Sequence, residues 1–126
     1  MMSKDIGIET IEINGVEYVK KADIEKPAES MDGMEYCIIR TYSAGVFAGY
    51  LYTMKGQEAV VKQARRLWRW SGAASLSQLA MVGTNKPTDC KFPCEVTSVT
   101  LTQVIEVIPC TETAKQSIAQ VKIWQS

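Results

Sequence analysis

Apolar and polar residues alternate in several short runs along this chain, and alternation of this kind is typical of β-strands that are buried on one face. The first run covers residues 8–13, and a second run, residues 16–19, follows directly after Asn14-Gly15. Asn-Gly accepts the positive φ angles of a type I′ turn, which joins two antiparallel strands. The pattern therefore predicts a β-hairpin near the amino terminus.

A polar stretch, residues 20–33, separates this hairpin from the rest of the chain and ends in the turn-forming pair Asp32-Gly33. Such a stretch is typical of a linker. We therefore expect two parts: a hairpin with its linker over residues 1–33, and a main domain over residues 34–126. Because an isolated two-stranded hairpin is marginal in water, we expect it to pack on the main domain or on a neighbouring subunit.

The main domain opens with three runs rich in β-forming residues, at residues 35–42, 46–54 and 58–62. Short glycine-containing turns separate them, and this spacing predicts a meander of antiparallel strands. Two further strand-like runs follow at residues 95–101 and 104–108.

Residues 66–70 allow two interpretations. As an extension of the third strand, the segment would place its side chains on two faces, with Arg66, Trp68 and Trp70 on one and Arg65, Leu67 and Arg69 on the other. The rival is a helix over residues 58–70. We favour the strand.

Two short helices are indicated by their ends. Ser75 and Gln78 have the spacing of a capping box, and Gly83 is placed to end that helix. Thr111 opens a second helical run, and Ile123-Trp124 then forms an apolar tail that we expect to dock on the domain. The predicted fold is α+β: a small antiparallel meander or barrel-like sheet with two short helices, plus an amino-terminal β-hairpin extension.

Composition limits the classes of function. The chain has 126 residues, 46% of them hydrophobic, which suits one domain with its own core. Its 14 basic and 14 acidic residues balance, so a broad electrostatic surface for duplex nucleic acid is not expected. No apolar run reaches the length of a membrane span, and the first residues lack the features of a secretory signal. We therefore expect a cytoplasmic protein with no membrane contact.

The absence of histidine argues against an enzyme, because the Ser-His and Cys-His nucleophile pairs and the usual neutral-pH base are missing. Cys90 and Cys94 have a C-x₃-C spacing that could supply two zinc ligands. A structural zinc site normally needs four ligands, so we interpret the cysteines as small reduced residues of a core or interface. We expect no catalytic residues, no metal and no cofactor.

The segment ARRLWRWSGAAS, residues 64–75, is the strongest candidate for a binding site. Guanidinium groups bind phosphate or carboxylate, and indole faces stack on planar rings. We assign the phosphate fork and stacking surfaces to Arg66, Trp68 and Trp70. Further electrostatic partners would be Arg40, Arg65 and Arg69, and backbone or hydroxyl contacts would come from Ser71, Gly72 and Ser75.

The same residue types also suit a subunit interface, or a core whose arginines cover apolar surface with their stems. A site where protomers meet would combine the first two options, and we expect a homo-oligomer. The Ser43-Ala44-Gly45 turn beside Arg40 is equally open: it could aim N–H groups at an anion, or it could be a tight turn that needs glycine.

Three motifs of the main domain, RTYSAGV from Arg40, ARRLWRWSGAASLSQL from Ala64 and LTQVIEVIPC from Leu101, carry a family likeness. The chain resembles a family of small phage and prophage proteins that is classed as a domain of unknown function. The likeness covers about residues 34–124. It implies a phage accessory protein in the cytoplasm of the bacterial host.

Small phage proteins without catalytic machinery commonly counter host defences, in some cases by sequestering signalling nucleotides between arginines and aromatic rings. By analogy, the resemblance leads us to expect a non-enzymatic protein that binds a small anionic or nucleotide ligand, as a sponge for an immune signalling nucleotide. The alternative is a protein-interaction module, either a virion accessory subunit or an inhibitor of a host enzyme. Binding of single-stranded nucleic acid is a third option, which net neutrality weakens.

Overall fold

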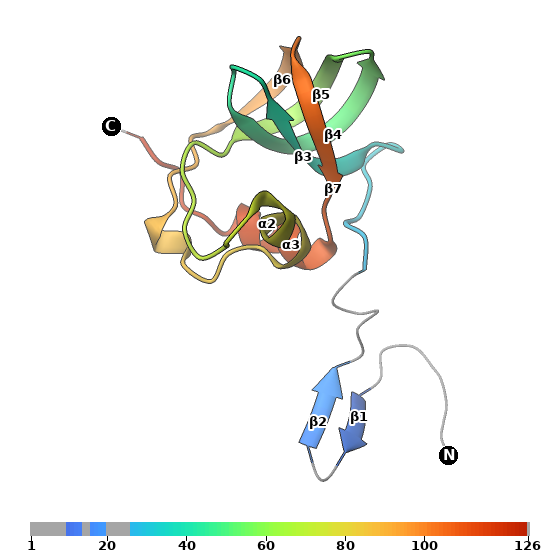
Figure 1. Cartoon of the computed structure of the whole chain (residues 1–126), viewed down its shortest axis with the longest axis vertical. Coiled ribbons are helices and arrows are strands. Elements are labelled where there is room, and N and C mark those ends of the chain that lie inside the picture. Colours follow the sequence, from blue (N-terminus) through green and yellow to red (C-terminus); the bar gives the residue numbers. More distant parts are fainter. Residues whose placement is uncertain (1–9, 14–15, 20–25, 126) are drawn as a thin grey trace.

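The computed structural model describes residues 10–13, 16–19 and 26–125 (Figure 1). Its main element is a five-stranded antiparallel sheet with the strand order β6-β5-β4-β3-β7. The strands are β3 (Glu35–Thr41), β4 (Val46–Lys55), β5 (Glu58–Arg66), β6 (Glu95–Leu101) and β7 (Val104–Pro109). Two helices, α2 (Leu76–Val82) and α3 (Glu112–Ala119), pack beside each other against one side of this sheet. The predicted α+β fold is confirmed.

The amino-terminal hairpin consists of β1 (Thr10–Ile13) and β2 (Val16–Val19), which form a separate two-stranded antiparallel sheet. Ile13 lies opposite Val16, as a two-residue turn requires. The turn itself, the residues before the hairpin and residues 20–25 of the predicted linker lie outside the described residues.

The last part of the predicted linker is itself a turn. Asp32 and Gly33 both have positive φ, at 51° and 81°, as the two central residues of a type I′ turn do. Met31 and Met34 close this turn with two backbone hydrogen bonds of 3.1 and 2.8 Å. The Asp-Gly pair therefore forms a tight reversal at the entry to β3, not a length of linker.

The sheet curls so far that residues 102–103 alone join its two edge strands, β6 and β7. Register shifts between β4 and β5 contribute to the curl, and Gln63 at one of them has a φ of 49°. Gly49 lies opposite, where a Cβ would stand 2.8 Å from the Lys62 carbonyl oxygen. The missing side chain thus allows β5 to approach β4 closely at the bulge.

Two buried clusters lie on opposite faces of the curled sheet. Strand residues alone make up the cluster inside the curl, among them Cys37, Ile39 and Phe47. The second cluster lies between the sheet and the helices and includes Ile38, Leu79 and Ile118. The alternation of Cys37, Ile38 and Ile39 between clusters explains why β3 is apolar at successive positions.

Both helices begin as their sequences predict. The Ser75 hydroxyl accepts a hydrogen bond from the Gln78 amide at 3.1 Å, and the Thr111 hydroxyl accepts one from the Ala114 amide at 3.0 Å. Gly83 ends α2 with a φ of 78°. The loop that follows contains one short 3₁₀ turn, Pro87–Asp89. In the described part of the chain, no helix is long and apolar enough to cross a membrane.

The segment after β5 is neither of the predicted alternatives. The strand ends at Arg66, and residues 67–70 continue as extended chain whose only bridge is formed by Arg69 with Lys91. One further backbone bond, from the Leu67 amide to the Val46 carbonyl at 2.8 Å, keeps the segment beside β4. The alternation of side chains expected for a strand is kept as far as Trp68: Leu67 is 1% exposed and Trp68 is 55% exposed, whereas Arg69 is exposed and Trp70 is half-buried.

Candidate functional site

A hollow of about 340 Å³ lies between the β3–β4 turn and the segment that follows β5. It is lined by residues 43–46 and by Arg66, Leu67, Trp68 and Trp70. The structure therefore brings together Arg66, Trp68 and Trp70, the three residues assigned to a pocket from the sequence, and sets them against the Ser-Ala-Gly turn. Their common position follows from the alternation after β5, which turns Leu67 into the core.

Arg66 is held in place by its neighbours and is still exposed. Its guanidinium donates a hydrogen bond to the Ala44 carbonyl and lies 4.3 Å from the centre of the Phe47 ring. Gly45, with a φ of 96°, brings the turn under this guanidinium. A guanidinium has five N–H donors, so this arrangement orients the group without consuming its capacity to bind an anion.

Trp68 forms a stacked pair with Trp124 of the carboxy-terminal tail, with ring centres 5.0 Å apart and planes 6° apart. The Lys91 ammonium lies 5.7 Å from the Trp68 ring and 5.5 Å from the Trp124 ring. The predicted docking of the apolar tail is confirmed by the 3.0 Å bond from the Trp124 amide to the Phe92 carbonyl. Trp124 covers one face of Trp68, and the Trp68 side chain is still 55% exposed.

Trp70 also lines a second hollow of about 460 Å³. Arg69 and Ser71, both predicted site residues, lie in this hollow, together with Lys91, Asp89 and Thr88. Arg69 is exposed, and its backbone is fixed by two hydrogen bonds with Lys91, of 3.2 and 2.7 Å. The predicted residues are thus divided between two hollows that share Trp70.

Arg65 has a different role from the predicted one. It is 7% exposed, and its guanidinium donates to four backbone carbonyls. The acceptors are Pro93 at 3.0 Å, Ile118 at 2.9 Å, Phe92 at 3.1 Å and Val121 at 2.6 Å. Burial lowers the pKa of Arg65, and its donors are engaged, so it ties β5 to the end of α3 and is not placed to bind a ligand.

Three other predicted residues lie outside both hollows. Arg40 forms an ion pair with Glu106 of β7, at 2.9 Å. Gly72 has a φ of 84°, and a Cβ there would stand 2.4 Å from the Thr84 hydroxyl, so close packing explains the glycine. The Ser75 hydroxyl is occupied in capping α2. These three residues have structural roles in the described contacts.

Several residues of the two hollows were not predicted. Lys91, Asp89 and Thr88 lie about 20 residues beyond Trp70 in the sequence, in a loop whose prolines gave no functional signal. Trp124, which stacks on Trp68 and lines neither hollow, was expected only as an apolar tail. No local pattern links these residues to residues 66–71, because the fold alone brings the loop and the tail beside that segment.

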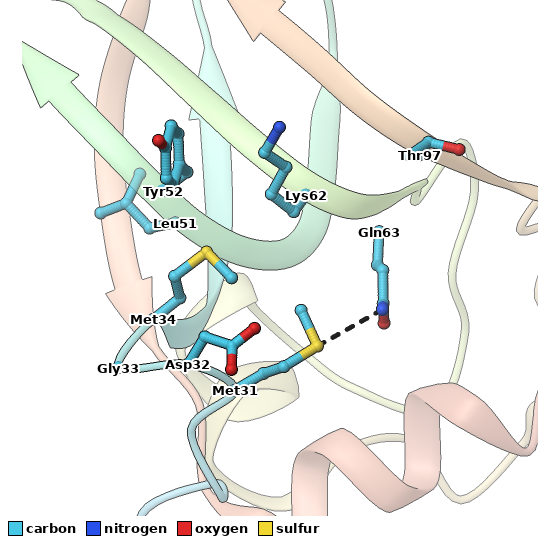
Figure 2. Close-up of a pocket in the computed structure, with 9 residues that line it drawn as sticks. All are labelled: Met31, Asp32, Gly33, Met34, Leu51, Tyr52, Lys62, Gln63 and Thr97. Carbon is cyan, nitrogen blue, oxygen red and sulfur yellow. Dashed lines mark hydrogen bonds between the residues drawn. The ribbon is translucent and has the colours of Figure 1, made fainter.

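Besides a hollow of about 710 Å³ along α3, whose lining includes Glu112, Gln116 and Gln120, two further hollows lie elsewhere on the domain. Figure 2 shows one of about 500 Å³, between the turn at residues 31–34 and strands β4 and β5. Its lining is dominated by Met31, Met34, Leu51 and Tyr52, and the Met31 sulfur accepts a 3.4 Å hydrogen bond from Gln63. The apolar lining makes it a poor candidate for an anion.

The other hollow, of about 330 Å³, lies between the sheet and α3. Tyr36 and Tyr50 meet there edge to face, with ring centres 5.2 Å apart, and the Lys115 ammonium lies 5.3 Å from the Tyr50 ring. Burial raises the pKa of Tyr36, and a hydrogen bond to Tyr50 raises the pKa of Lys115. The polar and aromatic groups of Lys115, Tyr36 and Tyr50 thus contact one another, so we interpret this cluster as structural.

No group of three or more His, Cys, Asp or Glu side chains in the described ranges is arranged to hold a metal ion. Cys90 is buried, with its sulfur 3.4 Å from the Ser71 amide, while Cys94 is exposed. The C-x₃-C pair is therefore divided between the interior and the surface.

Comparison with known proteins places the main domain in a family. No curated protein and no solved structure matches the chain. The model of one family, Domain of unknown function (DUF6948), matches residues 34–118. This range begins just after the Asp32-Gly33 turn and includes the sheet and nearly all of α3. The chain therefore belongs to the DUF6948 family, for which no function is assigned.

Proposed function

We propose that this protein is a non-enzymatic binding protein that takes up a small anionic ligand with a planar ring, such as a nucleotide, in the hollow lined by Arg66, Trp68 and Trp70. The observation that supports this most is the convergence of an exposed, oriented guanidinium and two indoles on one concave surface. A guanidinium fork suits phosphate, and indoles stack on bases.

The exposure of Trp68 also supports this proposal. A large aromatic ring that served only the core would be buried, because each such ring contributes most when its whole area leaves water. Trp68 instead presents more than half of its surface to solvent at the rim of the hollow. Stacking on Trp124 holds the ring in one orientation, which lowers the entropy cost of binding a planar ligand.

The resemblance to phage and prophage proteins leads us to propose a biological setting as well. The protein would act in the cytoplasm of a bacterial host and sequester a signalling nucleotide of an immune response. This setting rests on the analogy stated with the sequence, and the chemistry of the hollow is compatible with it.

The test is a panel of nucleotides added to the purified protein, with binding followed by thermal shift and titration calorimetry. A ligand that binds only the folded state raises the unfolding temperature with its concentration. We expect Trp68→Ala to abolish binding and Trp124→Ala, which leaves the hollow's lining intact, to retain most of it. Nucleotide affinity that is unchanged in Trp68→Ala would overturn the assignment.

A second candidate function is protein docking, and one observation favours it. The stacked Trp68 and Trp124 are 55% and 43% exposed, which makes a paired aromatic patch of the kind that anchors protein interfaces. Docking predicts that Trp68→Ala and Trp124→Ala weaken partner binding equally. Ligand binding predicts a much larger loss with Trp68→Ala than with Trp124→Ala, which removes only the stacking that orients Trp68.

We also propose that the protein forms a homo-oligomer, through the outer edge of β6. This edge strand has one charged residue, Glu95, and no proline, whereas β7 ends at Pro109. The Cys110 amide donates a hydrogen bond to the Tyr36 carbonyl of β3. The nitrogen of the preceding residue, Pro109, therefore faces the outer edge of the sheet, and it carries no hydrogen to donate. Natural edge strands without charges or proline are ready to pair with another strand.

Two copies of β6 are complementary to each other when they pair antiparallel about Ser98. That register sets Val96 opposite Thr100 and Thr97 opposite Val99, so β-branched side chains meet across the strands. The two Glu95 carboxylates lie at opposite ends of the pairing. A second copy of the chain is therefore the partner that suits this edge.

A further inference from the structure

The two hollows beside the 66–71 segment share one lining residue, Trp70. Trp70 packs partly against the helix-side core and is half-buried, so part of its indole is left between the hollows. The hollows measure about 340 and 460 Å³, and each lies within the size range of small-molecule sites. A ligand that occupies one hollow would reach Trp70 and could continue past it.

Positive charge is present on both sides of Trp70. Arg66 lines the first hollow, and Arg69 and Lys91 line the second. One carboxylate, Asp89, is found in the two linings taken together. Within the described ranges, the ion pair formed at 4.0 Å or less is that of Arg40 with Glu106, so these three cations have no carboxylate partner there.

Cations on two sides of an aromatic ring suit a ligand that carries two anionic groups, one for each side. The β- and γ-phosphates of a nucleoside triphosphate are joined through one oxygen. Their separation is too short for the two groups to lie on opposite sides of an indole. A dinucleotide separates its phosphates by a whole nucleoside, and that nucleoside carries a planar ring for stacking. Lys91 also connects the two hollows, since it lines the second one and its ammonium lies 5.7 Å from the centre of the Trp68 ring, which lines the first.

We infer that the ligand is a dinucleotide that straddles Trp70, with one phosphate at Arg66 and the other at Arg69 and Lys91. A base stacks in the first hollow, against Trp68 or Trp70. This inference rests on the proposed nucleotide-binding function and adds the second anion subsite, which a mononucleotide would leave empty.

The experiment compares three probes by titration calorimetry at fixed salt: AMP, the dinucleoside monophosphate ApA, and the 5′-phosphorylated dinucleotide pApA. Because pApA alone carries two phosphates, we expect it to bind at least about tenfold more tightly than either of the other two, the difference expected for one further charge-assisted contact. Three proteins are compared: the wild type, Arg69→Ala/Lys91→Ala, and the control Lys55→Ala, which removes an exposed positive charge at the end of β4.

We expect the Arg69→Ala/Lys91→Ala variant to lose the advantage of pApA while its affinity for AMP stays within about twofold of wild type. The Lys55→Ala variant should behave as wild type with all three probes. Arg66→Ala should weaken the binding of AMP and of pApA alike, because each probe loses the phosphate contact that Arg66 makes.

Two results would count against the inference in distinguishable ways. Equal affinity of the wild type for AMP and pApA would contradict the second subsite and leave the proposed nucleotide site at Arg66 standing. An equal loss of affinity for AMP and pApA in Arg69→Ala/Lys91→Ala would have the same consequence. Failure of all three probes to bind wild-type protein, at concentrations up to about 1 mM (a binding free energy of about 4 kcal/mol), would overturn the proposed function and the inference together.

Discussion

Arg65 and Arg66 are adjacent in the sequence and occupy opposite environments. The first is sealed among backbone carbonyls of the 92–93 loop and the end of α3, and the second is exposed beside the β3–β4 turn. Alternation along an extended chain accounts for the opposite directions. It does not determine which direction is inward, because that depends on what packs on each face of the sheet.

We predict that Arg65→Met destabilises the fold by about 3 kcal/mol, because four carbonyl oxygens, in three buried hydrogen bonds and one partly buried one, lose their donor at once. Arg66→Met, which removes one guanidinium bond at the surface, should cost less than about 1 kcal/mol. Urea unfolding followed by tryptophan fluorescence measures both. Equal destabilisation by the two changes would contradict the structural role of Arg65.

The four cysteines also differ in their surroundings, which gives a second prediction at this scale. Cys94 is exposed, while Cys37, Cys90 and Cys110 are buried. Burial also raises the pKa of the Cys37 and Cys110 thiols to about 12, which suppresses the reactive thiolate. We expect a thiol reagent to modify one cysteine in the native protein and all four after unfolding. Rapid modification of two cysteines in the native protein would contradict the burial of Cys37, Cys90 and Cys110.

At the scale of elements, the bulge at Gln63 is the feature that shapes the sheet. It adds one residue to β5 opposite β4 and leaves Gly49 in close contact with the β5 backbone. The bulge increases the local twist, and the curl then allows edge strands β6 and β7 to be joined by two residues.

Gly49→Ala is predicted to destabilise the protein by about 2–3 kcal/mol, since the added Cβ would stand 2.8 Å from backbone and side-chain atoms of β5. Gly56→Ala is the matched control. Gly56 has a φ of 61° and open space around it, so its substitution carries only the cost of the backbone conformation, about 1 kcal/mol. Thermal or urea unfolding of the two variants compares close packing with φ alone, and a milder effect at Gly49 would refute the packing argument.

At the scale of the whole molecule, the two buried clusters each contain a thiol whose pKa is raised, Cys37 in one and Cys110 in the other. A group whose pKa is higher in the folded than in the unfolded state contributes stability that is lost as the pH rises. The unfolded thiols ionise near pH 9, whereas the folded ones hold their protons to about pH 12. Tyr36, with its raised pKa, acts in the same direction.

We therefore predict that stability is level below about pH 8 and falls steadily above about pH 9, at about 1.4 kcal/mol per pH unit for each thiol that ionises only on unfolding. Urea midpoints measured at pH 8.0, 9.5 and 10.5 test this. A Cys37→Ala/Cys110→Ala variant is less stable at every pH, and its midpoint should decline less steeply. An identical slope in that variant would exclude the thiols as the cause.

The proposed pairing of β6 gives a last prediction. Ser98 is the residue that would lie opposite its own copy, so Ser98→Lys sets two like charges face to face and should convert a dimer to the 14.0 kDa monomer. Ile105→Lys places the same charge on the exposed side of β7 and should leave the dimer intact. Light scattering after gel filtration measures the mass. A wild-type monomer at about 100 μM, a concentration at which weak dimers with micromolar dissociation constants are populated, would exclude this interface.

Much of the fold could be predicted because its signals are local. Strand alternation, the Asn-Gly and Asp-Gly pairs and the residues at the helix ends each act through neighbours within a few positions. The convergence of Arg66, Trp68 and Trp70 could be predicted for the same reason, since residues two apart on extended chain share a face. The ion pair of Arg40 with Glu106 could not be predicted, because no local pattern links β3 to β7.

The sequence by itself thus determined the strands, the helix caps and a face that carries arginine and indole side chains. Only the tertiary structure decided that Arg65 serves the interior, that Trp124 stacks on Trp68, and that Lys91 adds a cation beside Trp70. The physical reason is that periodicity reports which residues face the same way. The order of strands and the curl of the sheet decide what lies opposite them, and these depend on packing among residues far apart in the chain.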